Sequence, residues 1–464
     1  MTIPTDLIQP DRGQDAVAIH LVNTDSFDEF AKGLSGPQRA ALKAQKFKGG
    51  GYQVGIVPAK DPQDDGWFAV GGVADPEELS SWCLAKLAEE LPEGTYRLEV
   101  RQPGPAMFGW MTAQYAFTRY RKDEDAEGPR VLLTEDVAKI DLISAEAQAS
   151  SLVADLVNTP AEDMGPASLE AEAERIAKEH KAEFSVVRGD TLETEYPMVH
   201  AVGRAADRKH GPRLLQIEWG DESHPRVAIV GKGVCFDSGG LDVKSSSGML
   251  LMKKDMGGAA HALALAELIM KSGLKIRLHC IVPAVENAIS SNAFRPGDVL
   301  DSRKGLTVEI GNTDAEGRLI LGDALTLASE HDPELIIDFA TLTGAARVAV
   351  GPDLPALFTR RDETAQQLIG AGKAHDDEPW RLPIHAAYSE YLKSDIADTN
   401  NAHSNPYAGA SVAASFLDKF VGEDIDWAHF DTFAWRPFAK PGRTKGGAAL
   451  GLRAAFHMLR GRYG

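Results

Sequence analysis

The stretch Arg226-Val-Ala-Ile-Val-Gly-Lys-Gly-Val-Cys-Phe-Asp-Ser-Gly-Gly240 begins as a buried strand and passes directly into a glycine-rich turn. A helix rich in Ala and Leu, Gly257 to Lys271, separates it from the next strand-like run, Ile276 to Val282. A later helix, Asp323 to His331, precedes another such run, Leu335 to Leu342. Strands that alternate with helices predict a mixed, mostly parallel sheet with helices covering both faces.

Charged residues are concentrated in the glycine-rich turns beside these strands. Small neighbours let the backbone approach an ion or a substrate closely. Clustered oxygen ligands with nearby cations indicate a metal-dependent hydrolytic site, although a solvated loop or an ion-pair network is the alternative. The sequence has no His-Glu-x-x-His pair and no cysteine cluster, which argues against a single-zinc protease or a structural zinc site. The charged residues are Lys232, Asp237, Lys244, Lys254, Asp255, Asp314, Glu316 and Arg318.

Three motifs occur in order: Gly-Lys-Gly-x-x-Phe-Asp-Ser-Gly-Gly from Gly231, Asp-Met-Gly-Gly-Ala-Ala from Asp255, and Asn312-Thr-Asp-Ala-Glu-Gly-Arg-Leu319. They resemble the leucine aminopeptidases, the cytosolic di-zinc exopeptidases, and the last octapeptide is the most specific of the three. The resemblance covers roughly residues 150–464. The first 140 or so residues match only in length and general pattern.

The resemblance implies two divalent metal ions per chain, zinc or manganese being favoured. Lys232, Asp237, Asp255 and Glu316 would hold the tighter ion. Asp237, Asp314 and Glu316 would hold the exchangeable ion, so that Asp237 and Glu316 bridge the pair. A lysine that binds a metal must be neutral, and an adjacent divalent charge can depress its pKa enough. The residues alone would instead make Lys232 a counter-ion.

The same resemblance implies hydrolysis by a hydroxide held between the two metals. Lys244, with one metal, would stabilise the tetrahedral oxyanion. Arg318 would bind a bicarbonate ion that passes the proton to the leaving amine, and a structural salt bridge is the alternative for this residue. Lys254 is expected to be a surface or ion-pair residue. The loop Leu241–Gly248 differs from the Lys-Pro-rich version of many relatives but keeps Lys244.

Four residues match positions that line the first side-chain pocket in the family: Met252, Asn312, Thr341 and Gly344. A methionine and small residues suit a flexible, apolar side chain, although Met252 taken singly could equally be core. The free amine of a substrate would bind the tighter metal near Asp255, which would explain exopeptidase action. The predicted function is removal of apolar N-terminal residues from peptides. The alternatives are a specialised dipeptidase, and a binding or regulatory protein that keeps the fold without catalysis.

The expected organisation is a small N-terminal α/β domain over residues 1–140, a linker helix over 141–162 and a catalytic domain over 163–464. Alternating apolar patterns predict strands in the N-terminal domain, and one segment has a helical pattern. A polar, acidic stretch is expected to be a surface loop. The strands are Ala16–Val22, Gly51–Val57 and Thr95–Val100, the helical pattern is Pro76–Glu90, and the acidic stretch is Lys122–Pro129.

Composition narrows the partners and the compartment. The 464 residues carry 49 Lys and Arg against 68 Asp and Glu, a net charge of −19, which argues against nonspecific nucleic-acid or anionic-membrane binding. We expect no membrane span, because no apolar run of about 18 residues occurs, and no secretory signal. Three distant cysteines predict reduced thiols and a cytoplasmic protein. The partners would be peptide substrates and, by resemblance, other copies of the chain in a homohexamer.

Three further patterns have both a structural and a functional interpretation. His429 and Asp431 share one strand face, where packing beside the site is favoured over a charge relay. Cys235 with His279 could form a nucleophile pair, but a buried thiol is the default. Gly49-Gly-Gly51 could cradle a phosphate, but it lacks the Lys-Ser/Thr of a P-loop and is expected to be a turn.

Overall fold

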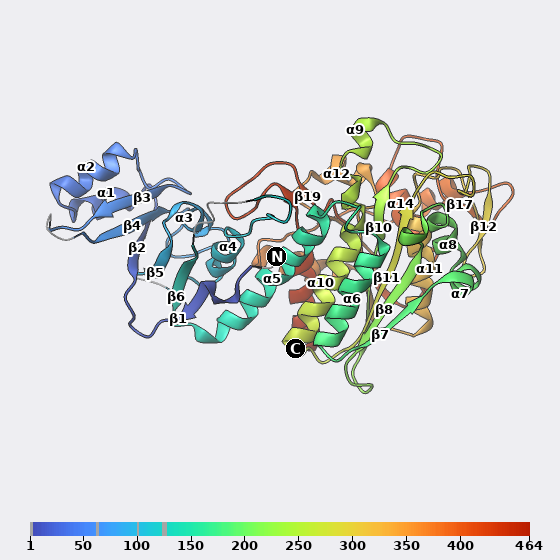
Figure 1. Ribbon diagram of the computed structural model, residues 1–464, viewed down its shortest axis with the longest axis horizontal. Helices are drawn as coiled ribbons and strands as arrows, with labels where there is room; N and C mark the ends of the chain where they lie inside the picture. Colours follow the sequence, from blue (N-terminus) through green and yellow to red (C-terminus); the bar gives the residue numbers. More distant parts are fainter. Residues whose placement is uncertain (1–2, 62–64, 100–101, 123–127) are drawn as a thin grey trace. The chain divides into compact units, whose positions relative to one another are not determined.

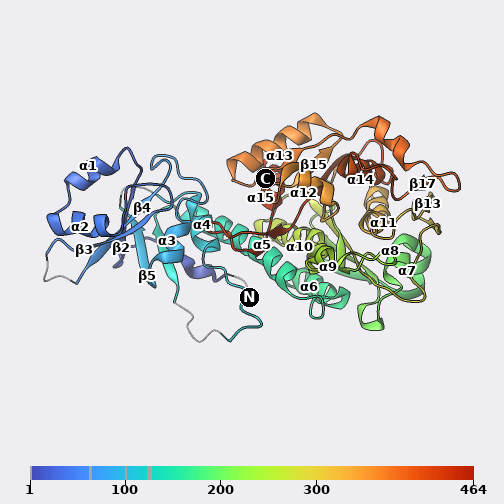
Figure 2. The ribbon, with the colours of Figure 1, turned by 90° about the horizontal axis from the view of Figure 1, so that it is seen from above.

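The computed structural model describes residues 3–61, 65–99, 102–122 and 128–464. Most of the acidic stretch Lys122–Pro129 and the end of the predicted strand at Val100 lie outside the described residues. The chain separates into two compact units, Met1–Ser151 with Phe438–Lys445 and Leu152–Pro437 with Gly446–Gly464 (Figures 1 and 2). The division falls within helix α5, Ile140–Asn158. The domain limits at 140 and 162 stay a proposal.

A sheet in the order β1-β6-β5-β2-β4-β3 forms the first unit, and its described neighbours pair in parallel except β3 with β4. Its apolar core includes Val22, Leu42, Phe47, Val57 and Val70. The strands are β1 (Ile8–Pro10), β2 (Val17–Val22), β3 (Val54–Pro58), β4 (Trp67–Gly72), β5 (Gly94–Leu98) and β6 (Arg130–Thr134). The helices are α1 (Phe27–Lys32), α2 (Gly36–Ala44), α3 (Ala85–Glu90) and α4 (Ala106–Thr112).

The predicted helix Pro76–Glu90 is wrong over its first half, because helix α3 begins only at Ala85. Side chains before it bond to nearby backbone: Asp75 accepts from the Glu77 N–H, and the Ser80 hydroxyl accepts from the Trp82 N–H. Such local bonds compete with the helix for the same backbone groups. The turn at Gly49–Gly51 leads into Tyr52, whose N–H donates to Gly72 O at 2.8 Å, as expected of a structural turn.

The sheet of the second unit runs β16-β15-β18-β14-β9-β11-β8-β7, and β10 pairs with β11. The central pairs β18–β14, β14–β9, β9–β11 and β10–β11 are parallel, whereas β15–β18, β11–β8 and β8–β7 are antiparallel. The predicted mixed, mostly parallel sheet is confirmed. The strands are β7 (Glu183–Val187), β8 (Arg213–Trp219), β9 (Arg226–Gly231), β10 (Gly233–Asp237), β11 (Arg277–Asn287), β14 (Leu335–Ala340), β15 (Ala356–Thr359), β16 (Trp380–Arg381) and β18 (Asp426–Asp431).

Helices cover both faces of this sheet. Helix α10 packs against β9, β11 and β14 from one side together with α6 and α15, and α11 packs on the same strands from the other side with α8 and α14 (Figure 1). Nearly every residue of α10 is buried, as expected of a helix that is apolar all round. Their bounds are α6 (Pro166–Glu179), α8 (Pro197–Gly203), α10 (Gly257–Ser272), α11 (Gly317–Glu330), α14 (Gly409–Asp418) and α15 (Leu452–Tyr463).

Shorter elements complete the second unit. Strands β12, β13 and β17 form one small sheet, and β19 pairs with β20. None of the helices in the described part of the chain has the length and apolarity needed to cross a membrane. The remaining elements are β12 (Val299–Asp301), β13 (Thr307–Glu309), β17 (Thr399–Asn400), β19 (Trp435–Arg436), β20 (Gly446–Gly447), α7 (Gly189–Glu195), α9 (Ser246–Met249), α12 (Gly344–Val350) and α13 (Asp362–Ala374).

Candidate active site

A cavity of about 690 Å³ lies where several strands of the second unit end. Lys232 follows β9, Asp237 ends β10 and Asp431 ends β18, so the cavity is at the carboxyl ends of parallel strands, where α/β sheets place ligands. The structure brings all eleven predicted site residues to its wall. They are Lys232, Asp237, Lys244, Met252, Asp255, Asn312, Asp314, Glu316, Arg318, Thr341 and Gly344.

Two glycines allow the acidic segments to pack against the strand ends. A Cβ atom on Gly258, at the start of α10, would lie 2.1 Å from the carbonyl oxygen of Phe339 and 2.7 Å from the Lys232 nitrogen. A Cβ atom on Gly317, at the start of α11, would lie 2.4 Å from Cε of Lys232. Both helices can therefore begin against Lys232, which places the preceding Asp255 and Glu316 beside it.

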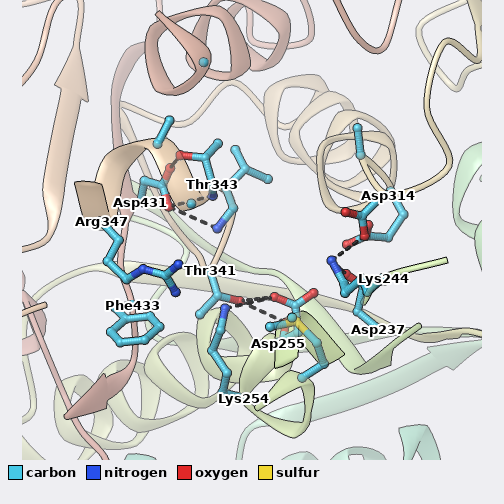
Figure 3. Close-up of a pocket in the computed structure, with 18 of the residues that line it drawn as sticks. Asp237, Lys244, Lys254, Asp255, Asp314, Thr341, Thr343, Arg347, Asp431 and Phe433 are labelled. Carbon is cyan, nitrogen blue, oxygen red and sulfur yellow. Dashed lines mark hydrogen bonds and ion pairs between the residues drawn. The ribbon is translucent and has the colours of Figure 1, made fainter. Parts of the chain in front are cut away.

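Two lysines bridge the four carboxylates. The Nζ atom of Lys232 lies 2.7 Å from Asp255 Oδ2 and 3.0 Å from Glu316 Oε1. Lys244 Nζ lies 2.8 Å from Asp237 Oδ2 and also contacts Asp314 (Figure 3). Burial disfavours both ammonium groups, but the carboxylates outweigh it and raise the pKa of each lysine above its ordinary value.

The neighbouring side chains do not fully compensate the negative charge of these buried carboxylates. Asp237, Asp255 and Glu316 are each 2% exposed or less, and each offers an oxygen within 4.8 Å of the others. Glu316 Oε2 is buried and has no hydrogen-bond partner among the described residues. Burial and the charge of Asp237 raise the pKa of Glu316 to about 8 and that of Asp314 to about 6. A divalent cation would supply the missing positive charge, so the residues fit metal ions.

Arg318 is held by a neutral partner. Its Nη1 donates to Asn401 O at 2.7 Å, and its Nε is buried without a hydrogen-bond partner among the described residues. Burial lowers the pKa of the guanidinium to about 10. The described residues show no ion pair between Arg318 and an acid, so the salt-bridge alternative is not supported.

Asparagines that the motifs did not single out shape the acidic loop. Asn401 accepts from the Gly311 and Asn312 N–H groups at 2.9 and 3.2 Å. Asn287 donates to Asp237 Oδ1 at 2.9 Å and to the carbonyl oxygen of Thr313 at 3.1 Å. Both come from distant segments, and nothing in their local sequence marks them. The predicted substrate residue Asn312 accepts from the Asp314 N–H at 2.8 Å, so it also orders this loop.

His429 and Asp431 do not form a relay. His429 Nδ1 lies 2.6 Å from Asp338 Oδ1 in the buried core, whereas Asp431 accepts from the Leu342 N–H at 3.0 Å and the Thr343 hydroxyl at 2.6 Å. Asp431 therefore orders the loop that holds Thr341 and Gly344. The expectation that packing explains this pair agrees with the geometry.

The thiol pair is also not a site. Cys235 is buried on β10 next to Val234, which pairs with Val285 of β11, but His279 lies towards the other end of β11, opposite Ala228 of β9. His279 Nε2 contacts Gln216 Oε1 at 3.1 Å instead. Burial raises the pKa of the Cys235 thiol well above its ordinary value, so the thiolate needed for attack is disfavoured.

Lys254 is not at the surface. It is 7% exposed and lines the cavity, and its Nζ lies 3.5 Å from Asp255 Oδ1. The surface interpretation of this lysine is therefore wrong, because its 3-10 segment, Met252–Met256, turns it inwards. The ion-pair interpretation agrees with the contact to Asp255.

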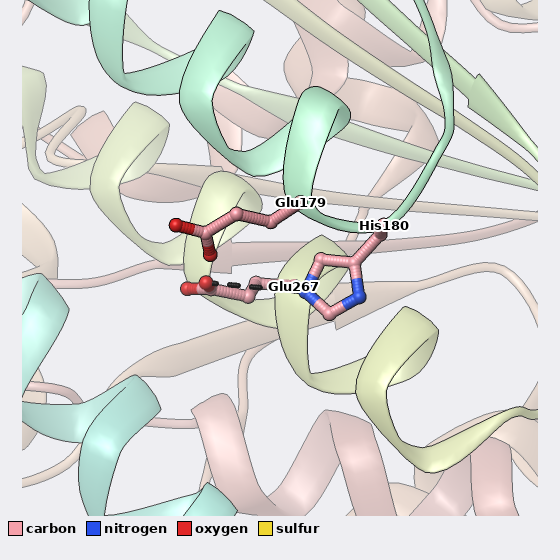
Figure 4. A group of neighbouring side chains, drawn as sticks. All are labelled: Glu179, His180 and Glu267. Carbon is pink, nitrogen blue, oxygen red and sulfur yellow. Dashed lines mark ion pairs between the residues drawn. The ribbon is translucent and has the colours of Figure 1, made fainter.

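A second acidic group, Glu179, His180 and Glu267, lies where helices α6 and α10 meet (Figure 4). Arg175 contacts both carboxylates, at 2.6 Å from Glu179 and 3.3 Å from Glu267. His180 is 4.0 Å from Glu267. A guanidinium already neutralises these acids, so the group is an ion-pair network.

Comparison with known proteins agrees with the motifs. Residues 151–455 match the catalytic domain of the cytosol aminopeptidase family, and residues 17–132 match the M17 aminopeptidase N-terminal domain. The chain belongs to the cytosol aminopeptidase family. The predicted resemblance, the two-domain α/β fold and the assignment as a peptidase are thereby confirmed.

Relatives of known sequence and structure extend over most of the chain. A probable cytosol aminopeptidase of Roseiflexus castenholzii is 37% identical over 446 residues, 91% of this chain and 88% of the relative. Peptidase B of Serratia proteamaculans is 41% identical over 66% of this chain and 73% of the relative. The crystal structure of a Coxiella burnetii cytosol aminopeptidase has a TM-score of 0.92 at 43% identity, covering 99% of this chain and all of the other. The bottromycin maturation enzyme BotP in complex with Mn has a TM-score of 0.86 at 29% identity, covering 97% and 99%.

Proposed function

We propose that the chain is a metallo-aminopeptidase that uses two divalent ions to release N-terminal residues from peptides. The observation that supports this most directly is the buried carboxylate group, in which Glu316 Oε2 lacks a protein partner. Family membership supports the aminopeptidase activity, and the Mn complex of BotP supports divalent metal use.

Two overlapping ligand sets are proposed. Lys232, Asp237, Asp255 and Glu316 would hold the tighter ion, and Asp237, Asp314 and Glu316 the exchangeable one; zinc and manganese are the favoured metals. When bound, the pair would activate a water as hydroxide and polarise the scissile carbonyl. Lys232 would have to lose its proton to bind a metal. Its ion pairs with Asp255 and Glu316 favour the protonated form, so the proton would leave only when a metal ion binds these two carboxylates instead.

The remaining roles belong to residues around this group. Lys244 would donate to the oxyanion, and Arg318, which no acid neutralises in the described residues, would hold bicarbonate. The substrate's free amine would lie near Asp255. An apolar first side chain would lie against Met252, Asn312, Thr341 and Gly344, since all four line the cavity. A cytoplasmic homohexamer is the proposed setting.

Restoring metals to chelated protein tests this function. After removal of metals, Zn²⁺ or Mn²⁺ should restore release of p-nitroaniline from leucyl-p-nitroanilide. N-acetyl-leucyl-p-nitroanilide should stay intact because it has no free amine. Absence of activity with all four ions, Zn²⁺, Mn²⁺, Co²⁺ and Mg²⁺, would support the non-catalytic alternative. Cleavage of dipeptides but not of matching tripeptides would support the dipeptidase alternative.

A further inference from the structure

A second cavity lies at the opposite end of the central strands from the active site. It measures about 470 Å³, within the range of small-molecule sites. Its residue Asp426 is the first of β18 and pairs with Leu335, the first of β14, so the cavity is at the amino ends of these parallel strands. Each strand has six residues, so roughly 20 Å of sheet separates this cavity from the active site. In Figure 1 the C-terminus, which is beside this cavity, lies at the bottom of the second unit and α12 at the top.

One buried carboxylate in the wall of this cavity is only half satisfied. Asp426 is 3% exposed. Its Oδ2 accepts from the Thr364 hydroxyl at 2.6 Å and from Arg462 Nη1 at 3.0 Å. Its Oδ1 is buried without a hydrogen-bond partner in the described part of the chain. A buried carboxylate oxygen without a donor is costly, so Oδ1 favours a ligand that brings one.

The neighbouring guanidinium does not serve this oxygen. Arg462 donates through Nε to Gln367 Oε1 and through Nη2 to the Thr364 hydroxyl at 2.7 Å, in addition to its bond with Asp426 Oδ2. Each of its three nitrogens therefore has an acceptor already. Arg462 and Thr364 hold the carboxylate in place and leave Oδ1 for a ligand.

Three exposed acids, Asp332, Glu334 and Asp424, form the outer wall of the cavity. The contact of Glu334 is with the Tyr463 hydroxyl, at 3.4 Å. Arg361 donates to the carbonyl oxygen of Asp424 at 2.7 Å rather than to its carboxylate. With Asp426, the lining has four acids against two arginines, a formal charge of −2. The cavity therefore favours a cationic ligand.

The spacing of the acids distinguishes a metal ion from an organic cation. Within the described ranges, the groups in which three acidic, histidine or cysteine ligand atoms lie within 4.8 Å of one another contain no residue of this cavity. A divalent ion needs several close oxygen ligands, whereas an ammonium group donates three hydrogen bonds without a fixed coordination shell. Pro333, Ile425 and the Tyr463 ring supply apolar surface for a methylene chain.

The charge of the lining separates two carriers of an ammonium group. A diamine would bring one charge to Asp426 Oδ1 and a second to the exposed acids. A free amino acid would instead bring a carboxylate beside those acids, and Arg462 is already engaged, so Arg361 would have to pair with it. The excess of acids favours a ligand with positive charge at both ends.

We propose that this cavity is a binding site for an aliphatic diamine or polyamine. One ammonium group donates to Asp426 Oδ1, the methylene chain lies on Ile425 and Tyr463, and the next ammonium group meets Glu334 and Asp424. The site is separate from the proposed metal centre, so the inference goes beyond the proposed function and depends on no hydrolysis.

Isothermal calorimetry of the metal-loaded protein with 1,5-diaminopentane tests the proposal. We expect binding that weakens as NaCl is added, because salt screens the exposed acids. 1-Aminopentane, with one charge, should bind more weakly, and 1,5-pentanediol, with none, should not bind detectably.

Asp426→Asn should weaken diamine binding by roughly 10- to 100-fold, the range for loss of a hydrogen bond to a charged group. Its melting temperature without ligand shows whether the variant folds. Glu334→Gln and Asp424→Asn change exposed side chains, so they test the site without disturbing the core, and each should weaken binding by a smaller factor. Asp395→Asn, an exposed acid outside both cavities, is the matched control and should bind as the parent does.

Three results would overturn the proposal. The first is the absence of diamine binding, or equal binding by the parent and the three cavity variants. The second is tighter binding of free lysine than of 1,5-diaminopentane, which would assign the cavity to an amino acid. The third is abolition of diamine binding by Mg²⁺ or Ca²⁺ at constant ionic strength, which would assign it to a divalent metal.

Discussion

At the residue scale, Glu316 and Asp237 are the two acids proposed to bridge the metal ions. Glu316 contacts Lys232 through Oε1, and its Oε2 has no protein partner among the described residues. Asp237 contacts Lys244 through Oδ2 and accepts from Asn287 through Oδ1. Each acid contacts a different lysine, and the two acids offer oxygens within 4.8 Å of each other, which is compatible with the proposed bridging role.

Glu316→Gln should lose both ions together, because the amide keeps the shape of the side chain but removes the charge that both ions share. The kcat of this variant should fall by more than about 100-fold. Elemental analysis and leucyl-anilide kinetics measure the two effects. Glu363→Gln, at an exposed position of α13, is the control and should bind metal as the parent does. A Glu316 variant within about tenfold of the parent, roughly 1.4 kcal/mol of barrier, would disprove the bridging role.

Lys244 and Arg318 should have different kinetic signatures. Lys244→Ala should lower kcat by roughly 10²–10³, the scale for loss of one oxyanion stabiliser. Arg318→Ala should cost less and should abolish any dependence of the rate on bicarbonate. The measurement is kcat in carbonate-free buffer and after addition of bicarbonate. A parent that ignores bicarbonate, or an Arg318 variant still activated by it, would remove this residue from the proposed mechanism.

At the scale of elements, close contact between helix starts and strand ends positions the acids. Helix α10 begins at Gly257 and Gly258 against the end of β14, and α11 begins at Gly317 against Lys232. The positions of Asp255 and Glu316 therefore depend on backbone contacts that a single methyl group would disturb.

Gly258→Ala should destabilise the protein by roughly 1–3 kcal/mol through overpacking, which outweighs the higher helix propensity of alanine. Thermal unfolding and metal content measure the effect, and both should fall. Gly370→Ala in α13 is the matched control, because an added Cβ there would meet no atom within 4 Å. A Gly258 variant as stable as the Gly370 variant would show that the contact with β14 can relax.

The buried pair of His429 and Asp338 predicts a pH dependence of stability. Burial lowers the pKa of His429, but Asp338 outweighs this and raises it above 6.5. The stabilisation is therefore fully present below about pH 6.5 and is lost as pH rises through the folded-state pKa. Melting temperature between pH 6 and 9 should fall less steeply for Asp338→Asn than for the parent. Equal slopes would show that His429 is neutral throughout this range.

At the scale of the whole molecule, the chain consists of two compact units, belongs to the cytosol aminopeptidase family and carries a net charge of −19. Several large apolar side chains of the second unit are exposed, including Val348 at 85%, Leu250 at 79% and Tyr407 at 71%. A surface covered by other subunits would shield such side chains from water.

Light scattering at assay concentration should therefore report about six times the monomer mass, as the proposed homohexamer requires. Val348→Asp, on the exposed side of α12, should weaken assembly because it would bury an unpaired charge. Glu363→Asp is a control that should assemble as the parent does. A monomeric parent would disprove the hexamer and leave the apolar surface to another partner.

Local sequence was sufficient for much of the fold and for the identity of the charged site residues. Buried strands and the Ala-rich helix were predictable because their apolar runs are continuous, and β9, β14 and α10 lie close to the predicted limits. Two predicted limits are wrong: β11 continues to Asn287, past the predicted Val282, and α11 begins at Gly317 rather than at Asp323. The first half of Pro76–Glu90 was not, because side-chain bonds to nearby backbone override its helical pattern. The glycine-rich motifs marked the acids of the cavity, although their metal roles stay predictions.

The sequence by itself determined the family, the strand–helix alternation and the residues whose chemistry suits divalent ions, because these depend on short motifs and on local hydrophobic pattern. Only the tertiary structure decided that Lys254 faces inwards, that Arg347 and Phe433 join it, and that Asn287, Asn401 and Asp431 hold the loops. Those residues are distant in the chain and carry no motif of their own. They meet because parallel strands bring their carboxyl ends to one edge of the sheet, a long-range consequence of topology that no local pattern encodes.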